Sequence, residues 1–123
     1  MVWGKTIKRR QSDILFSKYI RQRDGWRCFR CKKQFEENAP NLHASHFWGR
    51  GKESTRFDPE NVDAVCSFCH RYFESNPADY AALKEKQLGK ERYNALMVRA
   101  NATFRKRDDK MDVLYVRQLL KEI

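Results

Sequence analysis

The chain alternates between stretches with a helical period of apolar residues and short stretches typical of strands. Near the N-terminus, apolar residues recur every three or four positions and predict a helix over about residues 13–23, with Ser12 as its N-cap. Two short apolar stretches, residues 42–47 and 62–65, are typical of strands, and a loop rich in Gly and charge separates them. Residues 66–75 return to a helical pattern directly after the second strand.

The remaining residues predict three more helices. One covers about residues 77–88, because a proline stands at its first position and Gly89 follows its last. A second covers about residues 90–106, and a third covers about residues 110–122 with Asp109 as its cap. Two central strands flanked by helices predict an α+β protein.

The charge of the chain is strongly asymmetric. The formal net charge is +10, and residues 1–33 contribute +9 of it, from eleven Lys and Arg against Asp13 and Asp24. Such a basic segment is typical of a surface that meets a polyanion, with nucleic acid first and an anionic membrane second, or of a solvated face that aids solubility. No apolar stretch approaches the roughly 18 residues of a membrane-spanning helix. The basic start has no apolar stretch after it and is therefore not a signal peptide, so we expect a cytoplasmic protein, in a bacterium or a phage-infected host cell.

Four cysteines form two Cys-x-x-Cys pairs, Cys28 with Cys31 and Cys66 with Cys69, with 34 residues between the inner two. In a reducing compartment, cysteines at this spacing are metal ligands more often than disulfides. Four thiolates give Zn²⁺ tetrahedral coordination at about 2.3 Å. The rival interpretation, two redox pairs, lacks the βαβ pattern of such sites. We therefore predict a structural zinc site, which adds folding free energy to a small domain.

All three histidines lie within 28 residues of one another. His43 and His46 are on the first predicted strand, and His70 directly follows Cys69 at the start of a helix. Taken singly, each is as well explained by a surface position or by contact with the zinc site. Taken together with Asn61, they follow the order of a ββα-metal nuclease site: a strand with His, a loop, Asn, and a helix with His.

This ordered set resembles HNH endonucleases of the zinc-bearing type, through residues 23–31, 45–47, 58–62 and 66–70. A looser pattern, from residues 42–47 through Arg56-Phe57 to Tyr80, Leu83 and Gly89, is similar to NinG-like phage recombination proteins. The resemblance implies a small ββα-metal (HNH) core with two zinc knuckles, flanked by an N-terminal helix and C-terminal helices.

We expect one domain over residues 1–123. Residues 1–11 form a basic arm, residues 12–76 form the zinc-stabilised HNH core with its N-terminal helix, and residues 77–123 form a helical extension. The extension has more apolar positions than packing on a small core requires. Monomer and homodimer therefore both stay open.

The resemblance implies a role for three residues. His46 matches the general base, Asn61 matches the asparagine that pins the loop carrying the base, and His70 matches the helix residue that binds the catalytic metal. NinG-like members usually have Asn at the position of His70, so this position follows the HNH pattern. Many HNH enzymes have Asp or His before the base as a second metal ligand, and this chain has Ser45. Strand alternation places His43 on the same face as Ser45, so each is a candidate second ligand, with a DNA-facing or loop-facing side chain as the alternative for His43.

Basic residues in the arm and in the loop after the base are candidate contacts to phosphate, with ordinary solvation as the alternative. They are Arg9, Arg10, Arg50, Lys52 and Arg56. Among the loop residues, Arg56 fits the NinG-like Arg-Phe pattern best. A catalytic ion held mostly by water suits Mg²⁺, and an imidazole ligand also admits Mn²⁺ and other divalent ions.

The sequence therefore predicts a metal-dependent DNA endonuclease that hydrolyses phosphodiester bonds, including those of branched recombination intermediates. It would carry structural Zn²⁺ and catalytic Mg²⁺ or Mn²⁺. The alternative is a zinc-stabilised nucleic-acid-binding module whose catalytic site has degenerated at Ser45.

Overall fold

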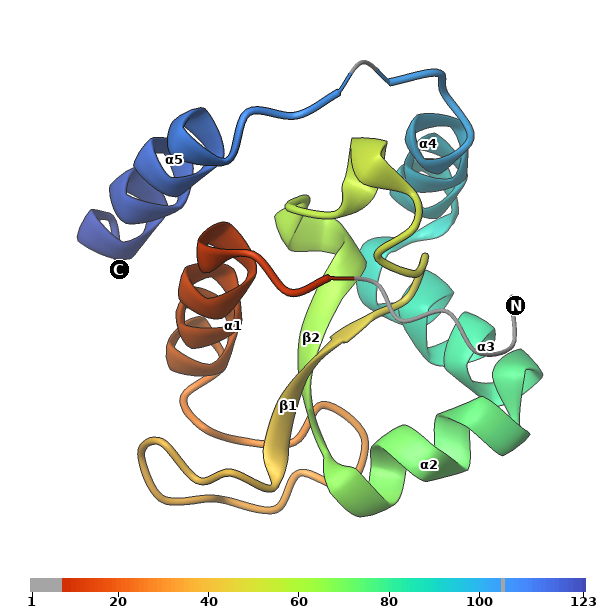
Figure 1. Ribbon diagram of the computed structural model, residues 1–123. Coiled ribbons are helices and arrows are strands. Elements are labelled where there is room, and N and C mark those ends of the chain that lie inside the picture. Colours follow the sequence, from red (N-terminus) through yellow and green to blue (C-terminus); the bar gives the residue numbers. More distant parts are fainter. Residues whose placement is uncertain (1–7, 105) are drawn as a thin grey trace.

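Two antiparallel strands form the centre of the computed structural model, which describes residues 8–104 and 106–123 (Figure 1). β1 (Leu42–His46) pairs with β2 (Val62–Cys66) along its whole length. The basic arm predicted over residues 1–11 lies largely outside the described residues. Within the described part, two strands and five α-helices make an α+β protein, which confirms the predicted class.

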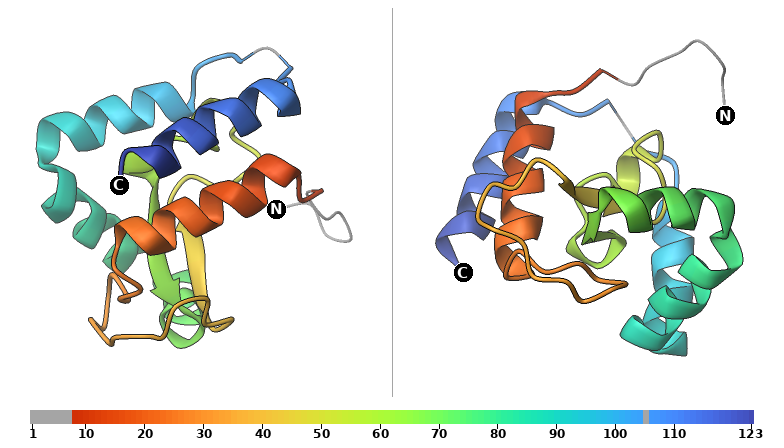
Figure 2. Two further views of the ribbon diagram at one scale, coloured as in Figure 1. Left: turned by 90° about the vertical axis from the view of Figure 1, so that its left-hand side faces the viewer. Right: turned by 90° about the horizontal axis from the view of Figure 1, so that it is seen from below.

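Helices cover both sides of the strand pair (Figures 1 and 2). They are α1 (Gln11–Arg23), α2 (Ser67–Ser75), α3 (Pro77–Leu88), α4 (Lys90–Ala100) and α5 (Asp109–Lys121). α1 packs against both strands from one side, and α5 lies alongside α1. α2 packs against the strands from the other side and continues into α3 and α4. No helix in the part that the structure describes is long and apolar enough to cross a bilayer.

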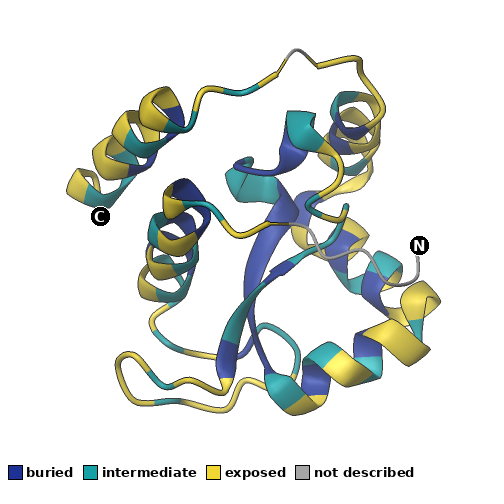
Figure 3. Cartoon of the chain, in the orientation of Figure 1, coloured by how far each residue is buried: buried dark blue, intermediate teal, exposed yellow. Residues whose placement is uncertain are grey.

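β2 is buried along its whole length, because it lies between α1 and the α2–α3 pair (Figure 3). β1 is only partly buried, and its side chains alternate between the two sides. His46 faces α1, where its ring lies 6.4 Å from the ring of Phe16. Ser45 faces α3, where its Oγ lies 2.9 Å from the hydroxyl of Tyr80. Neighbouring residues of β1 therefore belong to different sides of the molecule.

Two predicted helix caps have another role in the structure. Arg10 is the N-cap of α1, and its backbone N–H donates to Asp13 at 2.8 Å, whereas the N-cap of α5 is Asp108. Ser12 and Asp109, predicted as the caps, lie in the first turns of these helices and hydrogen-bond to each other. Ser12 and Asp109, both of types that favour cap positions, here join α1 to α5 through their hydrogen bond.

The helix predicted over residues 90–106 is shorter than expected. α4 ends at Ala100, where Asn101 caps it and donates through its side chain to the carbonyl of Met97 at 2.9 Å. Beyond it, Arg107 donates to the carbonyl of Glu53 at 2.7 Å and anchors the connection to α5. The predicted bounds of α3, by contrast, are confirmed, because Pro and Gly punctuate both of its ends.

Candidate functional site

The four cysteines converge where the loop after α1 meets the start of α2. Their Sγ atoms all lie within 4.8 Å of one another, and Cys31 Sγ is 3.9 Å from Cys66 Sγ. Sulfur atoms around tetrahedral Zn²⁺ are separated by about 3.8 Å when each Zn–S bond is about 2.3 Å. Cys28, Cys66 and Cys69 are buried, and Cys31 is exposed. The cysteines are thus positioned to bind a metal ion, as predicted, and four thiolates suit structural zinc.

The surroundings of the cluster favour the thiolate of Cys28, whereas burial raises the pKa of Cys31 and of Cys69. Burial raises the pKa of Cys28, but backbone N–H groups, foremost that of Cys66, outweigh it and lower the pKa to about 7. Arg30 donates to Cys69 Sγ at 3.4 Å, and its guanidinium lies 3.5 Å from the ring centre of Tyr72. Donors directed at sulfur stabilise the form that binds metal.

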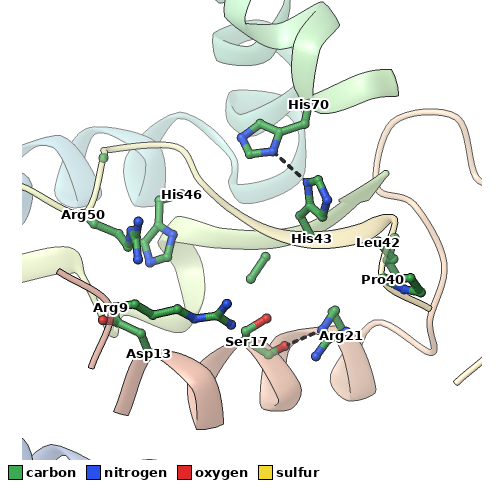
Figure 4. A pocket seen from close by; sticks show the side chains of 12 residues that line it. Arg9, Asp13, Ser17, Arg21, Pro40, Leu42, His43, His46, Arg50 and His70 are labelled. Atoms are coloured by element: carbon green, nitrogen blue, oxygen red, sulfur yellow. Dashed lines mark hydrogen bonds between the residues drawn. The ribbon is translucent and has the colours of Figure 1, made fainter. Parts of the chain in front are cut away.

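A cleft of about 640 Å³ opens between α1 and β1 and extends to the start of α2 (Figure 4). Its polar and charged lining residues come from separate parts of the chain. They are Arg9, Asp13, Ser17, Arg21, His43, His46, Arg50 and His70. The fold thus brings all three histidines to one cleft.

His46 is held in one orientation by the backbone. Its Nε2 lies 2.9 Å from the carbonyl oxygen of Arg56, which can only accept a hydrogen bond. In the neutral ring Nε2 therefore carries the proton, and Nδ1 keeps a free lone pair. Burial lowers the pKa of His46 to about 4, so the ring is neutral at pH 7.

Asn61 is completely buried and fixes the loop after His46. Its Nδ2 donates to the carbonyl of Trp48 at 2.8 Å and to that of Thr55 at 3.0 Å, and its Oδ1 accepts from the Trp48 backbone N–H at 2.8 Å. All three side-chain contacts go to the loop that begins directly after β1. This is the kind of contact expected of a residue that pins the loop.

His43 on β1 and His70 on α2 meet at the wall of the cleft. Their Nδ1 atoms are 3.2 Å apart. Two nitrogens at this distance either share a proton or face one cation, since ligands at about 2.1 Å from one ion have this separation. Burial, and next the charge of His70, lower the pKa of His43 and favour the neutral ring that a metal requires. Ser45, the other candidate ligand, is 1% exposed and does not line the cleft.

Three of the predicted phosphate contacts lie elsewhere. Arg56 is 1% exposed and forms an ion pair with Asp13 at 2.6 Å, so the described surface does not present it to a phosphate. Arg10 makes a two-pronged contact with Glu53, at 2.8 and 3.1 Å. Lys52 is exposed outside the cleft. Sequence alone does not show these pairings, because Arg56 and Asp13 are 43 positions apart.

Residues 4–122 match the family described as Bacteriophage Lambda NinG protein. The chain belongs to the NinG family. The match covers both the cysteine cluster and the cleft, and it confirms the similarity to NinG-like proteins. No curated protein and no solved structure gives a significant match to the chain.

Of the three arginines that line the cleft of this NinG-family protein, one was not among the predicted site residues. Arg21, near the C-terminal end of α1, lines the cleft together with the predicted residues Arg9 and Arg50. Helical spacing carried the only available signal, because Arg21 lies four positions after Ser17, which also lines the cleft. That signal does not distinguish an arginine in a cleft from one on an outer surface.

Proposed function

We propose that this NinG-family protein is a metal-dependent DNA endonuclease of the HNH type, with His46 as its general base. The observation that carries the proposal is the meeting of three histidines in one cleft. His46 has a neutral ring with a free Nδ1, and His43 and His70 present facing nitrogens. Membership of a phage family that resembles recombination proteins supports recombination-intermediate DNA as the substrate.

His46 would take the proton of the attacking water on Nδ1. The hydrogen bond from Nε2–H to the Arg56 carbonyl holds the ring in the required tautomer and stabilises the imidazolium that forms. The pKa of about 4 applies to His46 when no DNA is bound in the cleft. A bound phosphodiester raises the pKa of a neighbouring imidazole, because the negative charge favours protonation.

His43 and His70 would hold a divalent ion beside the phosphate. When bound, such an ion supplies Lewis-acid stabilisation of the phosphate oxygens and of the leaving oxygen. Two imidazole ligands favour Mn²⁺ and later transition ions over Mg²⁺, which prefers oxygen ligands. The 3.2 Å between the two Nδ1 atoms supports His43 as the second ligand in place of Ser45.

The proposed reaction is a hydrolysis in which water is the only co-substrate. The water oxygen forms a bond to phosphorus, and its proton passes to His46 Nδ1. The bond from phosphorus to the 3′ oxygen breaks, and the 3′ oxygen takes a proton from solvent. Asn61 keeps the loop and the Arg56 carbonyl in place while His46 gains its charge.

The test is a nicking and cleavage assay on supercoiled, linear and four-way-junction DNA. We expect cleavage with Mn²⁺ and none with EDTA. His46→Ala should lose about 10²–10⁴-fold in rate, the usual contribution of a general base, while its DNA affinity stays within a few-fold. Near-parental cleavage by His46→Ala would contradict the role of His46.

The same assay separates the alternative function. A parent protein that binds the junction but cleaves no DNA with any divalent ion is a zinc-stabilised binding module. Zinc content and circular dichroism of His46→Ala are the controls, since they show that the variant is folded. The assay needs no knowledge of the natural sequence preference.

A further inference from the structure

The arginines of the described residues differ in whether a carboxylate pairs with them. Six form ion pairs with carboxylates: Arg10, Arg23, Arg56, Arg92, Arg99 and Arg107. None of these six lines the cleft. The arginines that do line it, Arg9, Arg21 and Arg50, have no carboxylate within ion-pair distance in the part of the chain that the structure describes. The cleft thus gathers three arginines without a carboxylate partner, while Arg27, Arg30, Arg71 and Arg117, which also lack an ion pair among the described residues, lie outside it.

Asp13 also lines the cleft but does not neutralise these arginines. Both of its oxygens are used by Arg56, at 2.9 and 2.6 Å, and one also accepts from the backbone N–H of Arg10 at 2.8 Å. Its charge is therefore committed to the buried pair. The cleft as a whole remains suited to an anion.

The side chain of Arg21 is held at the far end of the cleft from Arg50 (Figure 4). Its Nε donates to the carbonyl of Ser17 at 3.2 Å, and its guanidinium lies 5.1 Å from the ring centre of Trp26. Arg21 is partly buried, and this burial, followed by the charge of Arg9, lowers its pKa. A fixed and partly desolvated guanidinium is typical of a phosphate site.

We propose that Arg21 binds a phosphate of the substrate strand next to the one that is hydrolysed. This inference rests on the proposed function, which puts the reacting phosphate beside His46. The strand would run along α1, from Arg9 and Arg50 to Arg21. Asp13 and Arg21 are eight positions apart on α1, about 12 Å at 1.5 Å per residue. This length exceeds the ~3.4 Å rise of one nucleotide along a strand, so the cleft has room for more than one phosphate.

The binding test uses the salt dependence of DNA affinity, measured by fluorescence anisotropy on a duplex oligonucleotide with the full chain. Arg21→Gln should weaken binding about tenfold and reduce the log–log salt slope by about 0.9, the value for one phosphate contact. Arg21→Lys keeps the charge and should keep most of the slope. Arg117→Gln is the matched control, because Arg117 is exposed on α5 and outside the cleft. An unchanged slope in Arg21→Gln overturns the proposal.

The catalytic test locates the phosphate. Bis(p-nitrophenyl) phosphate has a single phosphodiester, so Arg21→Gln should lose much less in kcat/KM on it than the loss of about tenfold expected on an oligonucleotide. An equal loss on both substrates overturns the proposal, since Arg21 would then contact the reacting phosphate.

The two tests keep the two proposals apart. A changed salt slope in a protein that cleaves nothing supports the phosphate site and contradicts the nuclease. Cleavage by the parent with an unchanged salt slope in Arg21→Gln supports the nuclease and contradicts the phosphate site at Arg21. If Arg21→Gln loses zinc or its helical circular dichroism signal, Arg21→Lys replaces it in the comparison. Arg21→Lys should still lose part of its affinity for the oligonucleotide, because lysine cannot make the two-pronged contact of arginine with a phosphate. Full parental affinity in Arg21→Lys, with the fold of Arg21→Gln lost, would assign Arg21 a structural role.

Discussion

The cysteine cluster and the histidine cleft are neighbouring sites with opposite character. In the cluster, the protein supplies four sulfur donors within 4.8 Å of one another, three of them buried. In the cleft, the protein supplies the two facing nitrogens of His43 and His70, and three arginines lack carboxylate partners among the described residues. A metal ion held by four protein ligands stabilises the fold, whereas an ion held by fewer protein ligands keeps coordination positions open for water or substrate.

The boundary between the two sites is a single peptide bond. Cys69 belongs to the cluster and His70 to the cleft, both in the first turn of α2. The cluster therefore fixes the position of the helix start from which His70 reaches His43. If the proposed function holds, substitutions in the cluster should act on the fold, and substitutions in the cleft should act on binding and chemistry.

Removing one cysteine should have the largest effect. Cys66→Ser should unfold the protein, because structural zinc contributes on the order of 10 kcal/mol, comparable to the whole stability of a small domain. Circular dichroism and metal analysis of protein purified without added zinc measure this. His43→Ala is the control and should keep both the fold and one zinc per chain. A folded Cys66→Ser protein with full zinc would end the distinction between the two sites.

Breaking the ion pair behind the cleft should come second. Asp13→Asn leaves buried Arg56 with only the longer contact to Glu53 at 3.4 Å, and breaking a buried pair typically costs about 3–5 kcal/mol of unfolding free energy. Glu60→Gln is the control, because Glu60 pairs with the more exposed Arg92 and Arg99, and such pairs contribute about 1 kcal/mol or less. Urea unfolding of both variants measures the difference. Equal losses would mean that burial of this pair has no energetic consequence.

The depressed pKa of His46 predicts a loss of stability in acid. As the pH falls below about 6.5, His46 takes up a proton in the unfolded state. In the folded state its pKa is about 4, so it stays unprotonated there until the pH is much lower. Stability present above pH 6.5 is therefore lost toward pH 4, and the cost at pH 5 relative to pH 7 is about 2 kcal/mol. Urea unfolding of the parent and of His46→Gln at both pH values gives the measurement. The decrease should be smaller by this amount in His46→Gln, and equal decreases would refute the buried, neutral ring.

The smallest expected effect concerns the second metal ligand. His43→Ala should raise the Mn²⁺ concentration for half-maximal cleavage about tenfold, or about 1.4 kcal/mol of metal binding. Ser45→Ala should leave it unchanged, because the Ser45 hydroxyl is bound to Tyr80. A titration of activity against Mn²⁺ decides between them. The reverse result would make Ser45, and not His43, the second ligand.

Local sequence rules predicted the parts of the molecule that depend on near neighbours. Two Cys-x-x-Cys pairs indicated the cluster because zinc coordination needs this spacing, and Pro77 and Gly89 marked the ends of α3 because of their backbone restrictions. The order of His46, Asn61 and His70 indicated a shared site, and the structure brings the two histidines to one cleft.

Pairings between distant residues could not be predicted in this way. Arg56 and Arg21 have the same chemistry, yet one is buried against Asp13 and the other lines the cleft without a carboxylate in the described residues. Ser12 and Asp109 are both good caps, and their mutual contact depends on how α1 and α5 pack. Composition gives the number of arginines, and tertiary packing decides which of them keep a free charge.

The contact between Ser12 and Asp109 joins residues 97 positions apart, and it has a consequence for biosynthesis. α1 forms a wall of the cleft and leaves the ribosome before α5, which packs on its other side. At about 5–20 residues per second, translation of the intervening chain takes about 5–20 s. During that interval α1 lacks α5 as its partner, so the cleft should reach its final shape only after α5 has emerged. Proteolysis of stalled nascent chains of increasing length would show α1 becoming protected when α5 emerges.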